Sequence, residues 1–472
     1  MMNNPVRLLL ATAAAAMIAG CSLTPQLARP DAPVAPEFPP HAEPAPGLTP
    51  ARPAVDIGWR EFFPDARLQA LIASALENNR DLRTAALRIE EARAQYNVQS
   101  ADLLPNVNAG VSGGRSRTPG GLSATGRPLI ANVYQVGLSL ASFELDFFGR
   151  VRSLNEAALA AYLATEEAQR AAQISLVAET AKAYLSELGA GEQLVLAQRT
   201  LEGREQGYKL AKQRFDVGAS SALDLRLNET LVQSARVSVL QLQRQRAQAR
   251  NALTLLVGTP LGDLPVGADL SSQNVVTAIP AGLPSDLLTN RPDIRAAESR
   301  LVAANANIGA ARAAFFPRIS LTAALGTAST ALSGLFDAGS MSWSFTPQLA
   351  LPIFDAGRNR GNLDLAVVRR DLAVTDYERT IQTAFREAAD ALVARGTLDE
   401  QAEAQRLVRE AQADRLNLAD QRFRAGVAST LDVLDAQREL FTAEQSLVQT
   451  RLLRLTNSVD LYRTLGGGLH EN

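Results

Sequence analysis

The chain has 472 residues, of which 47 are Lys or Arg, 49 are Asp or Glu, two are His and one is Cys. A single cysteine excludes an intrachain disulfide and any multi-cysteine metal cluster, and two histidines, His41 and His470, give little basis for histidine chemistry. A net charge of −2 gives no electrostatic basis for binding nucleic acid. We therefore expect a structural or transport protein without a cofactor, neither an enzyme nor a nucleic-acid binder.

Residues 1–20 have the layout of a signal peptide. Arg7 supplies a positive charge, and the apolar run from Leu8 to Ile18 is too short to cross about 30 Å of hydrocarbon. Two small residues then precede Cys21, which resembles the cysteine of a bacterial lipobox, a residue that carries an N-acyl chain and an S-diacylglycerol. Ser22 stands where lipoproteins kept at the inner membrane usually carry Asp, so the resemblance points to the outer membrane. The competing interpretation is a buried cysteine after an ordinary signal.

Residues 21–64 are expected to be a lipidated, proline-rich tether. Eleven of the 23 prolines of the chain lie between residues 25 and 64. Such a composition favours extended polyproline conformation over packed helix. We predict a linker along the outside of the body, and not a domain.

The rest of the sequence is a tandem duplication. Asn79–Arg83 returns 212 residues later as Arg291–Arg295, and Arg214–Gly218 returns 208 residues later as Arg422–Gly426. An ordered series of such matches predicts two repeats and a connector between them. They span residues 65–258 (repeat 1), 259–284 (equatorial connector) and 285–472 (repeat 2 with a C-terminal tail).

Each repeat is predicted to contain a first helix, two strands, a long helix and a return helix. No proline occurs from residue 129 to 259 or from 353 to 472, so long helices are possible there. Arg150–Val217 and Arg358–Ala425 are rich in strong helix formers, and each would form a rod of about 100 Å. In the second return helix a heptad seam suits antiparallel coiled-coil contact. Its members are Leu434, Phe441, Val448, Leu455 and Tyr462.

The turns at the hairpin tips follow one chemical pattern. Gly218 and Gly426 stand where a left-handed residue would end each long helix. Ser221 and Ser429 follow three residues later, each with an Asp at the third helical position, a capping-box pattern for the return helix. Asp435, one turn further on, has no such capping role.

Four segments alternate apolar with small or polar residues, which is the period of a β-strand. They lie near residues 107–115, 133–143, 318–327 and 343–352. A soluble half-buried strand gives the same alternation, but a lipid-anchored chain with segments of about ten residues suits a transmembrane β-barrel. Four strands cannot close a barrel, so the chain is expected to oligomerise, with two copies giving eight strands and three giving twelve.

These features together resemble the TolC/OprM family of outer-membrane factors, over nearly the whole mature chain. The resemblance implies an α+β membrane protein whose homotrimer forms a 12-stranded barrel and an α-helical periplasmic tunnel. It implies a passive exit duct for multidrug efflux, loaded by an inner-membrane RND transporter through a periplasmic adaptor (membrane fusion) protein. The matching stretches are Cys21–Leu23, Arg29–Val34, Asp56–Phe63, Leu76–Arg83, Glu144–Arg150, Gly282–Leu288, Ala311–Pro317, Leu434–Arg438 and Leu465–Gly468.

The resemblance also implies where the duct closes. Its narrowest ring would be built at the second tip from Leu431 and Asp435, with Arg438 as the ion-pair partner of Asp435. The first tip departs from this pattern because Leu227 stands at the position equivalent to Asp435. The competing interpretation makes Asp435 a solvated surface residue. Adaptor contact is expected at the tips, at Gly218, Ser221, Gly426 and Ser429.

Three rival functions are compatible with parts of the sequence. A duct of the same build could serve metal efflux or type I protein secretion, and sequence periods do not separate these from drug efflux. A periplasmic coiled-coil lipoprotein without a pore would lack the four alternating strands. An enzyme is the weakest rival, because no Gly-rich phosphate loop follows a strand and no Ser/His/Asp set is present. The recurring acids Asp146 and Asp355 are interpreted as packing or ion-pair residues.

Overall fold

The computed structural model describes residues 22–38, 52–124, 126–275 and 279–471. They divide between two compact units, each assembled from three segments of the chain. Unit 1 comprises residues 1–31, 88–166 and 296–378, and unit 2 comprises residues 32–87, 167–295 and 379–472. The expected signal peptide and Cys21 lie outside the described residues.

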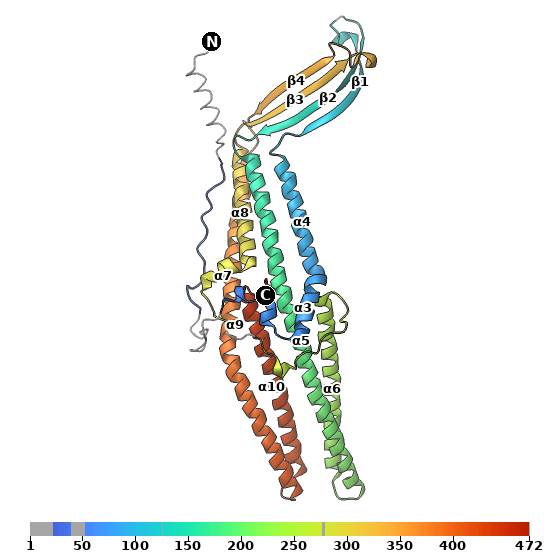
Figure 1. The fold of residues 1–472 in the computed structure, drawn as a ribbon, viewed down its shortest axis with the longest axis vertical. Helices are drawn as coiled ribbons and strands as arrows, with labels where there is room; N and C mark the ends of the chain where they lie inside the picture. Colours follow the sequence, from blue (N-terminus) through green and yellow to red (C-terminus); the bar gives the residue numbers. More distant parts are fainter. Residues whose placement is uncertain (1–21, 39–51, 125, 276–278, 472) are drawn as a thin grey trace. The chain divides into compact units, whose positions relative to one another are not determined.

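Unit 1 contains a four-stranded antiparallel sheet in the order β1-β2-β3-β4 (Figure 1). The strands are β1 Val107–Thr118, β2 Leu129–Leu145, β3 Arg318–Ser329 and β4 Met341–Ala350. Short 3-10 turns lie in the two loops beyond the sheet, at Gly120–Leu122 and Leu332–Gly334. The α+β fold predicted from the four alternating segments is confirmed, and the alternative of a helical lipoprotein without strands is wrong.

The register of the sheet separates two faces of different chemistry. One cross-strand row consists of Ala109, Leu138, Leu325 and Trp343, and we call the face that carries it the apolar face. The adjacent row, on the opposite face, consists of Asn108, Ser139, Ala324 and Ser344. The side chains of β4 are exposed along its whole length, on both faces of the sheet.

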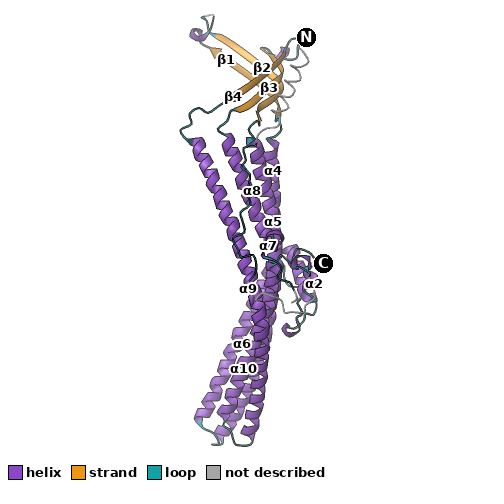
Figure 2. Cartoon of the chain, turned by 90° about the vertical axis from the view of Figure 1, so that its left-hand side faces the viewer, coloured by secondary structure: helices purple, strands orange, loops and turns teal. Residues whose placement is uncertain are grey.

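The helices flanking the strands are long and regular (Figure 2). α4 spans Arg80–Ala101 and α8 spans Pro292–Ala313, while α5 (Arg150–Asp216) and α9 (Arg358–Arg424) have 67 residues each. α5 continues through Gly189, where an added Cβ would lie 3.1 Å from a methyl group of Leu452. The glycine therefore allows close helix packing. Among the described residues, no helix combines the length and apolarity needed to cross a membrane.

In unit 2, the return helices α6 (Ala222–Val257) and α10 (Thr430–Thr464) complete the two hairpins. Leu194 and Ala197 of α5 pack with Val239 and Leu242 of α6, and Phe441 of α10 lies against this cluster. Of the predicted heptad seam, Val448, Leu455 and Tyr462 are buried.

Both return helices end at a glycine with positive φ. Gly258 (φ 78°) and Gly466 (φ 89°) lie 208 residues apart in the sequence. An added Cβ at Gly258 would lie 2.4 Å from the carbonyl oxygen of Asn78, and one at Gly466 would lie 2.8 Å from that of Asn290. Each repeat therefore closes against its own first helical segment through the same glycine joint.

The proline-rich tether ends earlier than predicted. Residues 52–64, expected to be extended linker, contain a 3-10 turn (Ala54–Asp56) and the short helix α2 (Trp59–Phe62). Trp59, Phe62 and Phe63 are fully buried, and Phe62 stacks on Tyr462 with ring centroids 4.0 Å apart. Burial of these aromatic rings outweighs the extended preference of the flanking prolines, so this segment belongs to the core of unit 2.

Asp65 fastens the connector to the start of α3 (Ala66–Asn78). One carboxylate oxygen accepts the backbone N–H groups of Arg67 and Leu68, and the other accepts from the Tyr184 hydroxyl, the Ala268 N–H and the Gln273 amide. Burial alone would raise the pKa of the Asp65 carboxyl, but the hydrogen bonds from the Gln273 amide and from the three backbone N–H groups lower it. The connector also contains a 3-10 turn, Leu270–Ser272, and leads into α7 (Pro284–Asn290).

The first described residues lie along α8 in unit 1. Arg312 donates to the carbonyl of Leu23, and Asn305 donates to that of Pro25. An added Cβ at Gly309 would lie 2.3 Å from the Thr24 hydroxyl oxygen, so only glycine lets the segment approach this closely. The beginning of the tether is thus bound to the helices and does not hang free.

Candidate functional site

The two hairpin tips share one backbone geometry. Gly218 has φ 74° and Gly426 has φ 77°, and each donates its N–H to a phenylalanine carbonyl three residues earlier. The next residue donates to an arginine carbonyl five residues earlier, at 2.7 Å from Ala219 and 3.0 Å from Val427. This is the hydrogen-bond pattern of a Schellman ending, which satisfies the last carbonyls of the long helix.

Both return helices begin with the predicted capping box. The Ser221 hydroxyl accepts from the Asp224 N–H at 3.1 Å, and the Ser429 hydroxyl accepts from the Asp432 N–H at 3.3 Å. Each Asp side chain accepts the serine N–H in return. The hydrogen bond from the Ser429 backbone lowers the pKa of the Asp432 carboxyl. Hydrogen bonds therefore satisfy the backbone at both tips, at the end of each long helix and at the start of each return helix.

Asp435 lies at the centre of an ion-pair cluster that joins the two helices of the second hairpin. Its Oδ2 is 2.6 Å from Nη2 of Arg415 on α9, and its Oδ1 is 2.5 Å from Nη2 of Arg438 on α10. Arg438 also contacts Glu439 at 3.0 Å. The expected partner Arg438 is in contact, and Arg415 is an additional partner that the sequence interpretation missed.

The first hairpin has no equivalent of this cluster. Counting back 208 residues from Arg415, Asp435 and Arg438 leads to Gly207, Leu227 and Thr230. The neighbouring Arg204 donates to the Leu231 carbonyl at 3.0 Å, and burial lowers its pKa. The two tips thus share a backbone and differ in charge.

Apolar side chains project from both tips. Leu431, the other residue expected in the narrow ring, is 61% exposed, and its counterpart Leu223 is 78% exposed. A leucine without packing partners at the end of a hairpin is available for contact with another chain. Between the hairpins lies a groove of about 230 Å³, whose lining includes Arg204, Asp224, Asp420 and Leu434.

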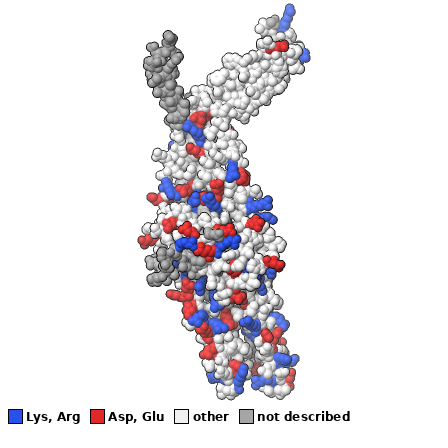
Figure 3. Space-filling model, in the orientation of Figure 1, with Lys and Arg blue, Asp and Glu red and all other residues white. Residues whose placement is uncertain are grey.

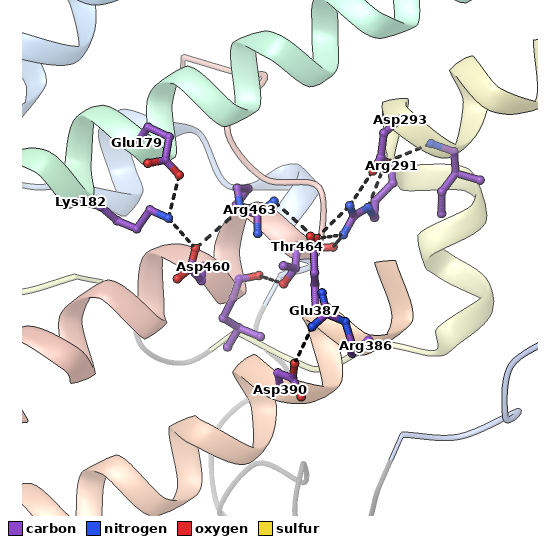
Figure 4. Close-up of polar contacts among 12 residues, drawn as sticks. Glu179, Lys182, Arg291, Asp293, Arg386, Glu387, Asp390, Asp460, Arg463 and Thr464 are labelled. Carbon is purple, nitrogen blue, oxygen red and sulfur yellow. Dashed lines mark hydrogen bonds and ion pairs between the residues drawn. The ribbon is translucent and has the colours of Figure 1, made fainter. Parts of the chain in front are cut away.

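A second polar cluster ties four helices of unit 2 together, at the end of α10 away from its hairpin tip (Figure 4). Arg291, which is 7% exposed, binds Asp293 at 2.6 Å and Glu387 of α9 at 3.1 Å. Glu387 also contacts Arg463 of α10. The chain of contacts continues through Asp460 to Lys182 of α5.

The sequence interpretation missed this cluster, although the alignment of the two repeats shows an unusual residue at Arg291. Arg291 stands at the position of Asn79, which in repeat 1 caps α4 by accepting the N–H groups of Asp81 and Leu82. A buried Arg in place of a capping Asn requires carboxylates nearby. Among the described residues, no group of three or more His, Cys, Asp or Glu side chains could hold a metal ion.

The chain is similar to known efflux proteins over most of its length. The sequence profile of the outer membrane efflux protein family matches residues 71–259 and 283–467, which follow the two repeats. The chain is 49% identical over 456 residues to outer membrane protein OprJ of Pseudomonas aeruginosa, covering 96% of this chain and 94% of that protein. It is 47% identical, with the same coverage, to the probable efflux pump outer membrane protein TtgC of Pseudomonas putida.

Solved structures show the same protomer fold. The open state of the MtrE outer membrane channel of Neisseria gonorrhoeae superposes with a TM-score of 0.87 at 43% identity, covering 96% of this chain and 99% of that one.

Proposed function

The chain belongs to the outer membrane efflux protein family, and from this premise we infer that it is the outer-membrane exit duct of a tripartite multidrug efflux system. Relatives named as efflux pump outer membrane proteins, at 47% identity or more, support this inference. The duct is a passive conduit, and the residues that line and close it determine its properties.

We propose that three copies assemble to form the duct. The sheet has an apolar face and a face of small and polar residues, with free edges at β1 and β4. Such an open sheet cannot face lipid, because its edge groups would lack hydrogen bonds. Three four-stranded sheets would close a 12-stranded barrel with the apolar face toward lipid, and the helices would extend into the periplasm.

A lipid anchor at Cys21 is part of the proposal. Residues just after it are held in unit 1, where the Thr24 and Ser153 hydroxyls lie 3.1 Å apart near the start of α5. α5 begins five residues after β2 ends, so a lipid on Cys21 would enter the bilayer beside the sheet. The mass of the mature protein tests this, because wild type would carry an N-acyl and an S-diacylglycerol group that Cys21→Ser would lack.

The closing ring is proposed at the second tip, on Leu431, Asp435 and Arg438. The observation that carries this is the convergence of two arginines on Asp435 at one tip only. Three such tips in a trimer would hold the helix ends together through charge and apolar contact. A periplasmic adaptor that binds the tip turns at Gly218, Ser221, Gly426 and Ser429 would separate them and let the inner-membrane RND transporter discharge its drugs.

Single-channel conductance of the purified protein in planar bilayers tests the ring. Leu431→Ala with Asp435→Ala should raise conductance several-fold, because both the apolar contact and the ion pairs are lost. The matched control, Leu223→Ala with Leu227→Ala, changes the equivalent positions of the first tip and should have little effect. Unchanged conductance in the first variant, or an equal rise in the control, contradicts the assignment.

A further inference from the structure

Two arginines lie on the apolar face at the far end of β1. In the register with β2, Arg115 pairs with Asn132 and Arg117 pairs with Ile130. Both arginines are exposed, and they share their face with Val111 and Ala109 nearer the helices. The face that is apolar over most of the sheet therefore ends in two cations.

These cations lack a counter-ion. Within the part of the chain that the structure describes, neither arginine makes an ion pair or a side-chain hydrogen bond. At the opposite end of the sheet the pattern differs, because Arg150 and Arg318 both bind Glu144, at 2.7 and 2.6 Å. The arginines at the helical end therefore have a carboxylate partner within the protein, and Arg115 and Arg117 have none among the described residues.

Closure of a barrel supplies little compensation. β4, which would pair with β1 of the next copy, carries no charged residue from Met341 to Ala350. The two loops beyond the sheet, residues 119–128 and 330–340, contain one acid, Asp337, and a further cation, Arg127. The distal end therefore keeps a net positive charge, and Figure 3 shows charged atoms at that tip beyond a largely uncharged sheet surface.

The depth of the arginines matches the headgroup layer. On β2 the apolar face runs from Leu145 to Tyr134, about 25 to 30 Å along the barrel axis at an ordinary strand tilt, which is the height of a lipid-facing band. Tyr134 covers Gly113 of β1, where an added Cβ would lie 3.3 Å from the ring. Arg115 and Arg117 lie one and two rows beyond this tyrosine. At that level the cost of exposing a cation to lipid is small.

We propose that Arg115 and Arg117 bind phosphate groups of the glycolipid in the outer leaflet. This proposal rests on the proposed function, since it requires the sheet to be part of an outer-membrane barrel. Guanidinium groups bind phosphate through paired hydrogen bonds, and two arginines two residues apart on a strand project in parallel, about 7 Å from each other. Three copies would place three such pairs around the rim.

Binding of diphosphorylated lipid A to the purified full-length protein in detergent, measured by native mass spectrometry, tests the site. Wild type should retain the lipid, and Arg115→Gln with Arg117→Gln should weaken binding about tenfold. The matched control is Arg244→Gln with Arg250→Gln on α6, which removes two exposed arginines that make no ion pair or side-chain hydrogen bond among the described residues. The control should bind lipid A as wild type does.

Two results overturn the proposal: unchanged binding by the β1 variant, or equal binding of chemically dephosphorylated lipid A by wild type. Conductance of the same samples separates this failure from that of the proposed function. If the wild-type protein forms channels while the lipid results are negative, only the glycolipid site is wrong. If wild type forms no channel, and Leu431→Ala with Asp435→Ala, which removes the proposed ring, forms none either, the premise of a barrel is wrong.

Discussion

At the scale of single residues, the contacts of Asp435 show what sequence alone can reach. Asp435 and Arg438 lie three residues apart, so helical spacing predicts their contact. Arg415 lies on the preceding helix, α9. Which side chain of α9 faces Asp435 depends on the axial register in which α9 packs against α10. A coiled-coil seam fixes the face of a helix but leaves the axial register open, so this partner was not predictable.

Removing Arg415 should loosen the proposed ring without abolishing it. In Arg415→Gln, Asp435 keeps Arg438 but has one unpaired carboxylate oxygen. Cation selectivity should therefore rise, and conductance should rise less than it does in Asp435→Ala. An exposed ion pair is worth about 0.2 to 1 kcal/mol and is screened by salt, so the difference should shrink in 1 M KCl. Planar-bilayer recordings at two salt concentrations measure this.

The control for this variant is Arg409→Gln. Arg409 also joins α9 to α10, through Glu444 at 3.6 Å, but it does not contact Asp435. An equal change in both variants would mean that general weakening of the hairpin, and not Asp435, sets the conductance.

At the scale of elements, the helix ends were the most predictable features. A glycine followed three residues later by Ser-x-x-Asp ends one helix and caps the next through hydrogen bonds between residues close in sequence. The sequence alone therefore predicted both capping boxes. The aromatic core around Trp59 was not predictable, because its partners, Tyr462 and the backbone of His470, lie some 400 residues away. The proline content of that segment predicted an extended linker, but composition does not show which distant residues its aromatic side chains pack against.

Loss of a cap should be visible at one tip alone. Ser429→Ala removes the hydroxyl that accepts the Asp432 N–H, at a cost of about 1 kcal/mol, so amides 430–434 should exchange hydrogen about fivefold faster at pH 7. Ser238→Ala is the control, because that hydroxyl bonds a carbonyl within α6 and caps nothing. Equal acceleration around residue 238 would contradict the capping role.

The same cap should weaken in acid. Because the folded state lowers the pKa of the Asp432 carboxyl below its usual value of 3.8, its contribution is complete above that value and is lost as the pH falls through the lower folded pKa. Asp432→Asn should therefore differ from wild type at pH 6 and match it in strong acid. Hydrogen exchange of the tip amides at the two pH values checks this.

At the scale of the whole molecule, the two faces of the sheet should differ in whether a charged substitution prevents assembly of the oligomer. Phe345→Arg places a cation on the apolar face, where a mid-membrane arginine costs about 2 to 4 kcal/mol, so the yield of heat-resistant oligomer should fall sharply. Ser344→Arg, one residue away on the opposite face, should assemble normally and reduce cation selectivity. Semi-native electrophoresis and channel recordings distinguish the two variants, and equal loss of oligomer would contradict the assignment of faces.

The glycine joints at the ends of the return helices have a consequence for how such a protein can change. Gly218 and Gly426 begin the tip turns, and Gly258 and Gly466 close the repeats, each pair at the same spacing. Duplication has kept these joints and altered the side chains between them. A chain with residues 204–257 replaced by a copy of 412–465 keeps every joint. A three-copy assembly of that chain would carry six Asp435-type clusters in place of three, and closure would then depend on how many copies of one module the gene contains.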